Sequence, residues 1–92
     1  MFYDTLIEIW GNPTTDTNYL DRIYGDFQEY EKTLKIEEFT FNITKRVFCD
    51  YTTLITDKSY FKINGEFYKC IKPKVFDNYM EIMLYKIQGG DN

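Results

Sequence analysis

The feature that most constrains the fold is an Asn-Gly pair, Asn64-Gly65, set between two short runs rich in aromatic and β-branched residues. Both central positions of a type I′ turn require a positive φ, which Asn and Gly tolerate better than other residues. Residues 59–71 therefore predict a β-hairpin with a two-residue turn. A hairpin names an element of a fold and does not by itself indicate an activity.

The alternation of side chains along a strand assigns two faces to this hairpin. With a two-residue turn, Ile63 lies opposite Glu66 and, farther from the turn, Phe61 lies opposite Tyr68. We expect the core-facing side chains to be Phe61, Ile63, Tyr68 and Cys70, and the opposite face to carry Lys62, Phe67 and Lys69.

A period of two between apolar residues predicts three further strands, over residues 2–10, 39–49 and 79–87. In the first strand Ile7 and Ile9 share one face, opposite Leu6, Glu8 and Trp10. Phe39, Phe41 and Ile43 should form the buried face of the second strand, and Met80, Ile82 and Leu84 alternate with Glu81, Met83 and Tyr85 in the third.

Two short segments of the sequence predict irregularities within strands. Lys45-Arg46 interrupts the alternation of the second strand and indicates a bulge or bend. Lys72-Pro73-Lys74 should end or bend the strand that follows the turn, because proline cannot donate to a β-ladder.

Residues 19–38 allow two interpretations. Apolar side chains three and four residues apart fit one helix. Gly25 and the aromatic and β-branched residues near it argue against an unbroken helix. We therefore favour a strand over residues 20–26 and a short helix over residues 28–38, with Asp26 as the helix N-cap.

The whole chain of 92 residues is long enough for one compact domain. Aromatic residues make up 20% of it, a composition that favours strands. The predicted fold is mainly β: a small antiparallel β-barrel of five to six strands with one short α-helix, forming a single domain over residues 1–92. Residues 88–92 should be a flexible tail.

Residue chemistry argues against catalysis. The chain has no His, which removes His general bases and His metal ligands. The acidic neighbours Glu29 with Glu31 and Glu37 with Glu38 do not face each other across a cleft, as glycoside hydrolysis requires. Ser59 has no His to activate it. We expect no enzyme, no catalytic residue, no metal site and no cofactor.

Two cysteines, Cys49 and Cys70, lack the spacing of a zinc site or a disulfide framework, so we expect reduced thiols in a cytosolic protein. No apolar run is long enough to span a bilayer, and no signal peptide is visible at Met1.

The net charge is −4, divided as −6 over residues 1–43 and +2 over residues 44–92. This uneven charge suits stacking of copies, or is ordinary solvated charge; it does not form a basic nucleic-acid footprint.

In this order the segments resemble the head-closure proteins of tailed bacteriophages and prophages, also called stopper, head–tail connector or "minor capsid" proteins. The resemblance covers about residues 6–87. It rests on the strand and loop opening Trp10-Gly11-Asn12-Pro13-Thr14, on the strand-then-helix segment 21–38, on residues 44–50, on the hairpin 58–71 and on the closing strand 79–86.

The resemblance implies a homo-oligomeric ring in the virion neck, assembled in the host cytoplasm. The ring would lie beneath the portal or adaptor protein, retain packaged double-stranded DNA in its channel, and dock the tail or tail-terminator protein, without a membrane. Some relatives close the channel with a long loop before the strand at Phe39; here residues 34–39 are too tight for one, which leaves residues 50–58 or 11–18 as mobile candidates.

Two sets of residues are candidates for these contacts. The possible channel-facing or DNA-facing residues are Asp26, Glu29, Glu31, Lys45 and Arg46. The possible subunit or partner interface comprises Trp10, Asn12, Leu54, Ile55, Lys62, Phe67 and Lys69.

Two other functions stay open. A small barrel with aromatic residues beside lysines is typical of OB-like modules that bind single-stranded nucleic acid or another ligand; the candidates are Tyr24, Tyr51, Tyr60 and Phe67, beside Lys62 and Lys69. An acidic chain of this size also fits a small phage inhibitor that mimics DNA.

Overall fold

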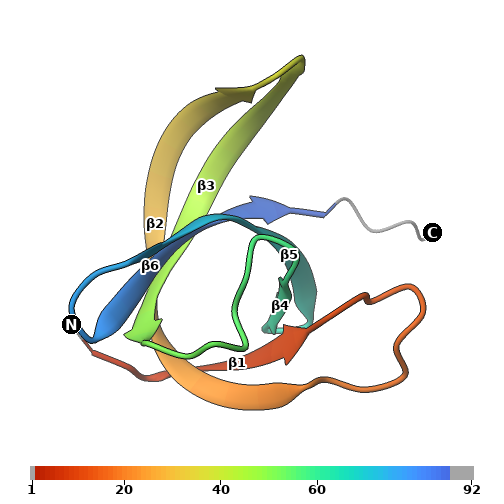
Figure 1. The fold of residues 1–92 in the computed structure, drawn as a ribbon, viewed down its shortest axis with the longest axis vertical. Helices are drawn as coiled ribbons and strands as arrows, with labels where there is room; N and C mark the ends of the chain where they lie inside the picture. The colour runs from red at the N-terminus through yellow and green to blue at the C-terminus, as the bar shows by residue number, and fades with distance from the viewer. Residues whose placement is uncertain (1, 88–92) are drawn as a thin grey trace.

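The computed structural model describes residues 2–87, which form six β-strands (Figure 1). Their bounds are β1 Thr5–Trp10, β2 Asp21–Ile36, β3 Phe39–Asp50, β4 Tyr60–Ile63, β5 Glu66–Val75 and β6 Tyr79–Lys86. The chain is mainly β, as the sequence predicts. This part of the chain contains no helix, so the predicted short helix is wrong. The tail expected over residues 88–92 lies outside the described residues.

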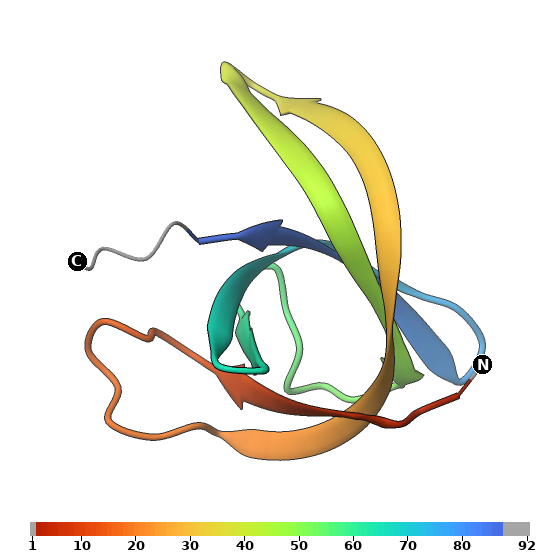
Figure 2. The same ribbon diagram turned by 180° about the vertical axis from the view of Figure 1, so that it is seen from behind.

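Every strand pairs with two neighbours, and all the pairs are antiparallel. The order is β1-β2-β3-β6-β5-β4, and β4 pairs back with β1, which closes the sheet into a barrel (Figure 2). The closing ladder is short, with Ile9 opposite Phe61 at its centre. Closure gives every strand of the sheet a partner on both sides along at least part of its length.

The hairpin between β4 and β5 forms as the sequence predicts. Asn64 and Gly65 make the turn with φ values of 53° and 82°. The register also agrees, with Ile63 opposite Glu66 and Phe61 opposite Tyr68. The Asn-Gly pair thus determines which side chains of both strands enter the core.

Apolar side chains from every strand fill the barrel. The hairpin side chains predicted to face the core are all buried: Phe61, Ile63, Tyr68 and Cys70. The core also takes one apolar face of β1, Ile7 with Ile9, and one of β6, Met80 with Ile82 and Leu84. Burying one such large side chain contributes about 1.5–3 kcal/mol. Val47 and Cys49 of β3 complete the same cluster.

The incorrect helix prediction has a specific cause, a β-bulge in β2 between Glu29 and Lys32. An extra residue reverses the inward and outward phase of a strand. Apolar residues on either side of the bulge are therefore an odd number of positions apart, as Phe27 and Leu34 are. A spacing of seven is also what a helix shows on one face, so the bulged strand imitates a helix in the sequence of residues 28–38.

The two irregular places expected from the sequence behave differently. Lys45 and Arg46 pair regularly with β2, and the extra residue of that bulge lies on β2. A second bulge occurs at Lys72-Pro73, where Lys72 has a φ of 48°. The strand bends there and continues past the proline.

The first bulge marks the place where the β2–β3 hairpin leaves the barrel. β1 pairs with β2 only as far as Gly25, and β6 pairs with β3 only from Lys45 onward. The remainder of the hairpin, residues 32–43, projects from the barrel and is called the arm (Figures 1 and 2). Its outer end is a two-residue turn at Glu37-Glu38, with a φ of 56° at Glu37.

The arm corrects the predicted burial of β3. Ile43, at the base of the arm, is buried, and Phe41 is half-buried with its ring against Tyr85 at 5.1 Å between centroids. Phe39 is 66% exposed, because the arm carries it beyond the barrel. Phe39, Phe41 and Ile43 do lie on one face of β3, but that face is covered by the core only at Ile43 and partly at Phe41.

Gly25 lies in the barrel wall where a side chain has no room. A Cβ there would lie 2.8 Å from Ile7 Cδ1 and 3.1 Å from the backbone oxygen of Phe48. We expect Gly25→Ala to lower the free energy of unfolding by about 1–3 kcal/mol, measured by urea denaturation. Gly65→Ala meets no atom within 4 Å and loses only the glycine's tolerance of its φ of 82°, about 1 kcal/mol. A Gly25→Ala variant as stable as the wild type would contradict this packing.

Candidate functional site

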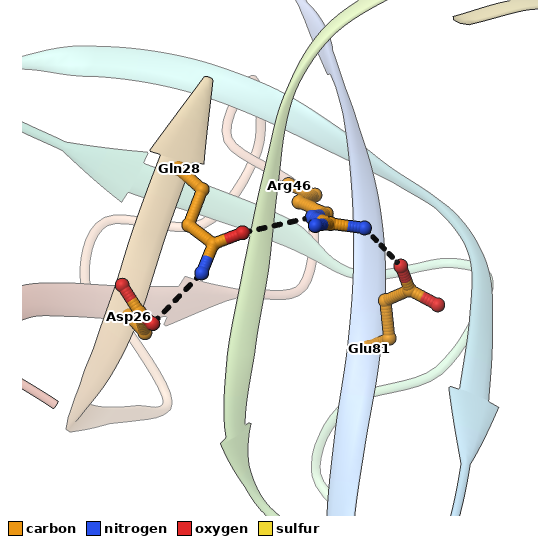
Figure 3. Close-up of polar contacts among 4 residues, drawn as sticks. All are labelled: Asp26, Gln28, Arg46 and Glu81. Carbon is orange, nitrogen blue, oxygen red and sulfur yellow. Dashed lines mark hydrogen bonds and ion pairs between the residues drawn. The ribbon is translucent and has the colours of Figure 1, made fainter. Parts of the chain in front are cut away.

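Four polar side chains from three adjacent strands form a network on the outer face of the barrel (Figure 3). Arg46 donates from Nε to Gln28 Oε1 at 2.9 Å and from Nη1 to Glu81 Oε2 at 3.0 Å. Gln28 Nε2 in turn donates to Asp26 Oδ2 at 2.8 Å. The chain of bonds links β2, β3 and β6 from outside, above the bonds of the backbone.

Aromatic rings hold the same guanidinium. The Arg46 Cζ lies 4.4 Å from the ring centroid of Tyr30 and 4.9 Å from that of Phe48. Cation–π contacts of this kind add about 0.5–2 kcal/mol, depending on how far they are desolvated. Arg46 therefore already has hydrogen-bond partners and aromatic contacts within the chain, and its position stabilises the wall of the barrel.

The five candidate channel-facing residues separate into three places. Asp26 and Arg46 belong to the outer network. Glu29 and Lys45 form an ion pair with each other, and Lys45 Nζ also lies 5.5 Å from the ring centroid of Phe27. Glu31 is exposed beside the bulge at the base of the arm. The five candidates thus include one ion pair, Glu29 with Lys45, and two residues joined through Gln28, but they do not form one common surface.

Three of the candidate interface residues come together on β1, β4 and β5. Trp10 meets Phe67 edge to face, at 5.4 Å between ring centroids, and Lys62 Nζ lies 5.5 Å from the Phe67 centroid. Trp10 Nε1 donates to Glu8 Oε1 at 3.0 Å. This half-buried group makes an outer patch of two rings and one cation.

The other four candidates have separate roles. Lys69 lies 4.7 Å from the Tyr60 ring centroid and donates from Nζ to the backbone oxygen of Asp57 at 2.8 Å. The Asn12 side-chain oxygen accepts two bonds from Thr14 and so shapes its own loop. Leu54 is 40% exposed, whereas Ile55 is buried and belongs to the core cluster.

A concavity of about 790 Å³ opens beside the segment that joins β3 to β4, and the sequence gives no sign of it. Its lining is largely apolar, from residues far apart in the chain: Ile36, Tyr51, Ile55, Cys70, Ile71, Val75 and Met80, with threonines 52, 53 and 56, Asp57, Lys72 and Pro73 at its sides. Only the closed sheet and the bulge at Lys72-Pro73 bring these side chains together.

The two thiols and the serine hydroxyl at and near this concavity are not activated as nucleophiles. Burial raises the pKa of the Cys70 thiol far above its usual range and that of Cys49 to about 12, so both stay protonated at neutral pH. The Ser59 hydroxyl donates to the backbone oxygen of Leu54 and accepts from the backbone N–H of Thr56. The concavity is suited to shape recognition and lacks an activated nucleophile at these positions.

The arm presents two unlike faces. Cross-strand pairs place apolar side chains on one face, namely Leu34 with Phe41 and Ile36 with Phe39. The pairs between them, Thr33 with Asn42 and Lys35 with Thr40, put polar side chains on the other face. The sequence pattern does not reveal the arm. The bulge gives the apolar residues of the sixteen-residue strand β2 an odd spacing, and this spacing indicates a helix.

Metal sites and membrane-spanning helices are two other classes of feature that residues 2–87 could contain. In this range no three His, Cys, Asp or Glu side chains are grouped as ligands for a metal ion. Among the same residues, no helix has the length and apolar character needed to cross a membrane. Comparisons with protein-family models, with curated proteins and with solved structures found no match. What the chain does must therefore follow from its own geometry.

Removing Arg46 should destabilise the barrel. Arg46→Met keeps part of the apolar stem but leaves Glu81, whose side chain is 20% exposed, without its cation. We expect a loss of about 1–2 kcal/mol in urea denaturation. Arg46→Lys should recover less than half of this loss, because lysine lacks the planar fork. Lys62→Met, which removes one cation–ring contact, is the matched control. Equal stability of Arg46→Met and wild type would show that the network is dispensable.

Glu66 supplies a test of pH dependence. Lys86 Nζ lies 2.8 Å from Glu66 Oε2, and this hydrogen bond together with the lysine charge lowers the pKa of Glu66 below 4.5. The stabilisation is therefore complete above pH 4.5 and is lost as the pH falls through the lower folded-state pKa. We expect Lys86→Met to raise the Glu66 pKa in a carboxyl NMR titration, and Lys58→Met to leave it unchanged. An unchanged value in Lys86→Met would contradict the pairing.

Proposed function

We propose that this chain is a structural subunit of a ring in the neck of a tailed phage or prophage, a head–tail connector of the stopper type. The ring lies beneath the portal or adaptor protein, retains packaged double-stranded DNA, and gives the tail or tail-terminator protein a docking platform. The observation that carries this proposal is the arm, a β-hairpin that leaves a closed barrel and exposes apolar side chains.

The barrel and the arm divide the work of such a subunit. The barrel is a closed sheet with a filled core, so it acts as a rigid body. The arm keeps Phe39 66% exposed and leaves Leu34 and Ile36 half-buried on the same face. Large apolar groups that stay exposed in a small domain are typical of surfaces that another protein covers. A neighbouring subunit is the partner that a ring supplies.

The charges of the arm suit a channel that DNA passes through. Glu37 and Glu38 form its outer turn, and Lys32 and Lys35 lie nearer to the barrel. A turn of this kind directed at the channel narrows it with a hairpin, where some relatives use a long loop. The two carboxylates repel DNA phosphates, which keeps the DNA free to slide when it is released.

A mechanical role also agrees with the chemistry of the barrel. The buried thiols are protonated, the Ser59 hydroxyl is fully engaged, and the Arg46 guanidinium is held by its own neighbours. These groups stabilise the fold. We therefore propose recognition and assembly, and not turnover of a substrate, as the activity of the chain.

Phe39→Ser tests the proposal. Because the ring is 66% exposed, the free energy of unfolding should change by less than about 1 kcal/mol. Self-assembly should weaken at least tenfold, measured by light scattering over a concentration series and by counting rings in electron micrographs. Tyr24→Ser, at a 59% exposed side chain of β2 outside the arm, is the control and should assemble normally.

Two results would count against the proposal. Assembly of Phe39→Ser as strong as that of the wild type would show that the arm takes no part in assembly. Alternatively, neither the purified protein nor the neck of assembled particles contains a ring of this chain, in which case the connector function is wrong.

A further inference from the structure

The arm carries two strand edges that no other strand of residues 2–87 pairs with. On β3, residues 39–43 lie beyond the last pair with β6, at Lys45. On β2, residues 32–36 lie beyond the last pair with β1, at Gly25. Every second backbone N–H and C=O along such an edge points away from its own hairpin and is able to bond to an added strand.

The β3 edge lacks the features that usually protect an edge. Natural edges are blocked by charged residues, prolines or bulges. Residues 39–43 read Phe-Thr-Phe-Asn-Ile, with no charge, no proline and no glycine, and their pairing with β2 is regular. Aromatic and β-branched side chains also favour the extended conformation that strand addition requires.

The arm already contains the ladder that an added strand would form. Inside the hairpin, residues 32–36 of β2 pair with residues 39–43 of β3. Leu34 and Ile36 lie beside Phe41 and Phe39, and Thr33 and Lys35 lie beside Asn42 and Thr40. Lys32 alone has an apolar partner, Ile43. When residues 32–36 of a second copy lie along the free side of β3 in the same register, the same side chains meet again. The only charges brought to the β3 edge are Lys32 and Lys35, and β3 has no lysine or arginine there to repel them.

We propose that the arms of successive copies pair edge to edge, with residues 39–43 of one copy along residues 32–36 of the next. This inference rests on the proposed ring and identifies its subunit contact. Since β2 runs outward and β3 runs back, arms that point the same way meet as antiparallel strands. Both edges of every arm are used, the apolar faces stay on one side, and the head-to-tail contact repeats until a ring closes.

Cysteine cross-linking tests this contact. Thr33 and Asn42 are exposed partners on the polar face of the arm, so two single variants, Thr33→Cys and Asn42→Cys, are prepared separately and one carries a mass tag. Cys49 and Cys70 stay buried and protonated in the folded protein and do not compete. The variants are mixed and oxidised with diamide. Thr17→Cys, in the exposed loop between β1 and β2, replaces Thr33→Cys in the control mixture.

We expect the Thr33→Cys and Asn42→Cys mixture to give at least tenfold more mixed disulfide than the control mixture. A product made mainly of two Asn42→Cys copies would overturn the proposal in favour of two-fold pairing of β3 with β3, which ends at a dimer. No product above the control would also overturn it. Electron microscopy of the unmodified protein then separates the two proposals: rings without the cross-link leave the connector function standing with another contact, and absence of rings removes both.

Discussion

The short ladder between β1 and β4 is the contact on which the rest of the structure depends. Ile9 and Phe61 face each other in it, and both are fully buried. Without this ladder the six strands would be an open sheet, with β1 and β4 as its two edges. With it, each of the six strands has a partner on both sides along part of its length. The hairpin arm, residues 32–43, then projects from a closed sheet with both of its outer edges unpaired.

The two bulges decide how far each strand follows the barrel. The bulge between Glu29 and Lys32 lets the β2–β3 hairpin turn away from the wall, so one pair of strands serves both the core and the arm. The bulge at Lys72-Pro73 bends β5 and contributes to the apolar concavity. At both bulges the regular strand pairing is interrupted, and the change of strand direction there shapes the arm in one case and the concavity in the other.

Polar chemistry in this chain is used for structure. The Arg46 network ties three strands together, and the Glu66–Lys86 pair joins β5 to the end of β6. Burial keeps the Cys49 and Cys70 thiols protonated. A molecule arranged in this way offers partners a shaped surface and a pair of open strand edges, which is why assembly is the function that its geometry supports best.

Local chemistry was enough to predict the Asn64-Gly65 hairpin, its inward face and the period-two strands, because turn geometry and alternation depend on residues that are neighbours in the chain. The sequence also identified Asp26, Glu29, Lys45 and Arg46 as candidate channel-facing charges, and only the fold showed that they belong to two separate groups. The tertiary structure alone decided that residues 28–36 belong to a strand and residues 37–38 to a turn, that Phe39 is exposed, and that β1 and β4 are the strands that close the sheet. These facts depend on one extra residue in β2 and on partners distant in the chain, and a periodicity measured along the chain cannot distinguish a bulged strand from a helix.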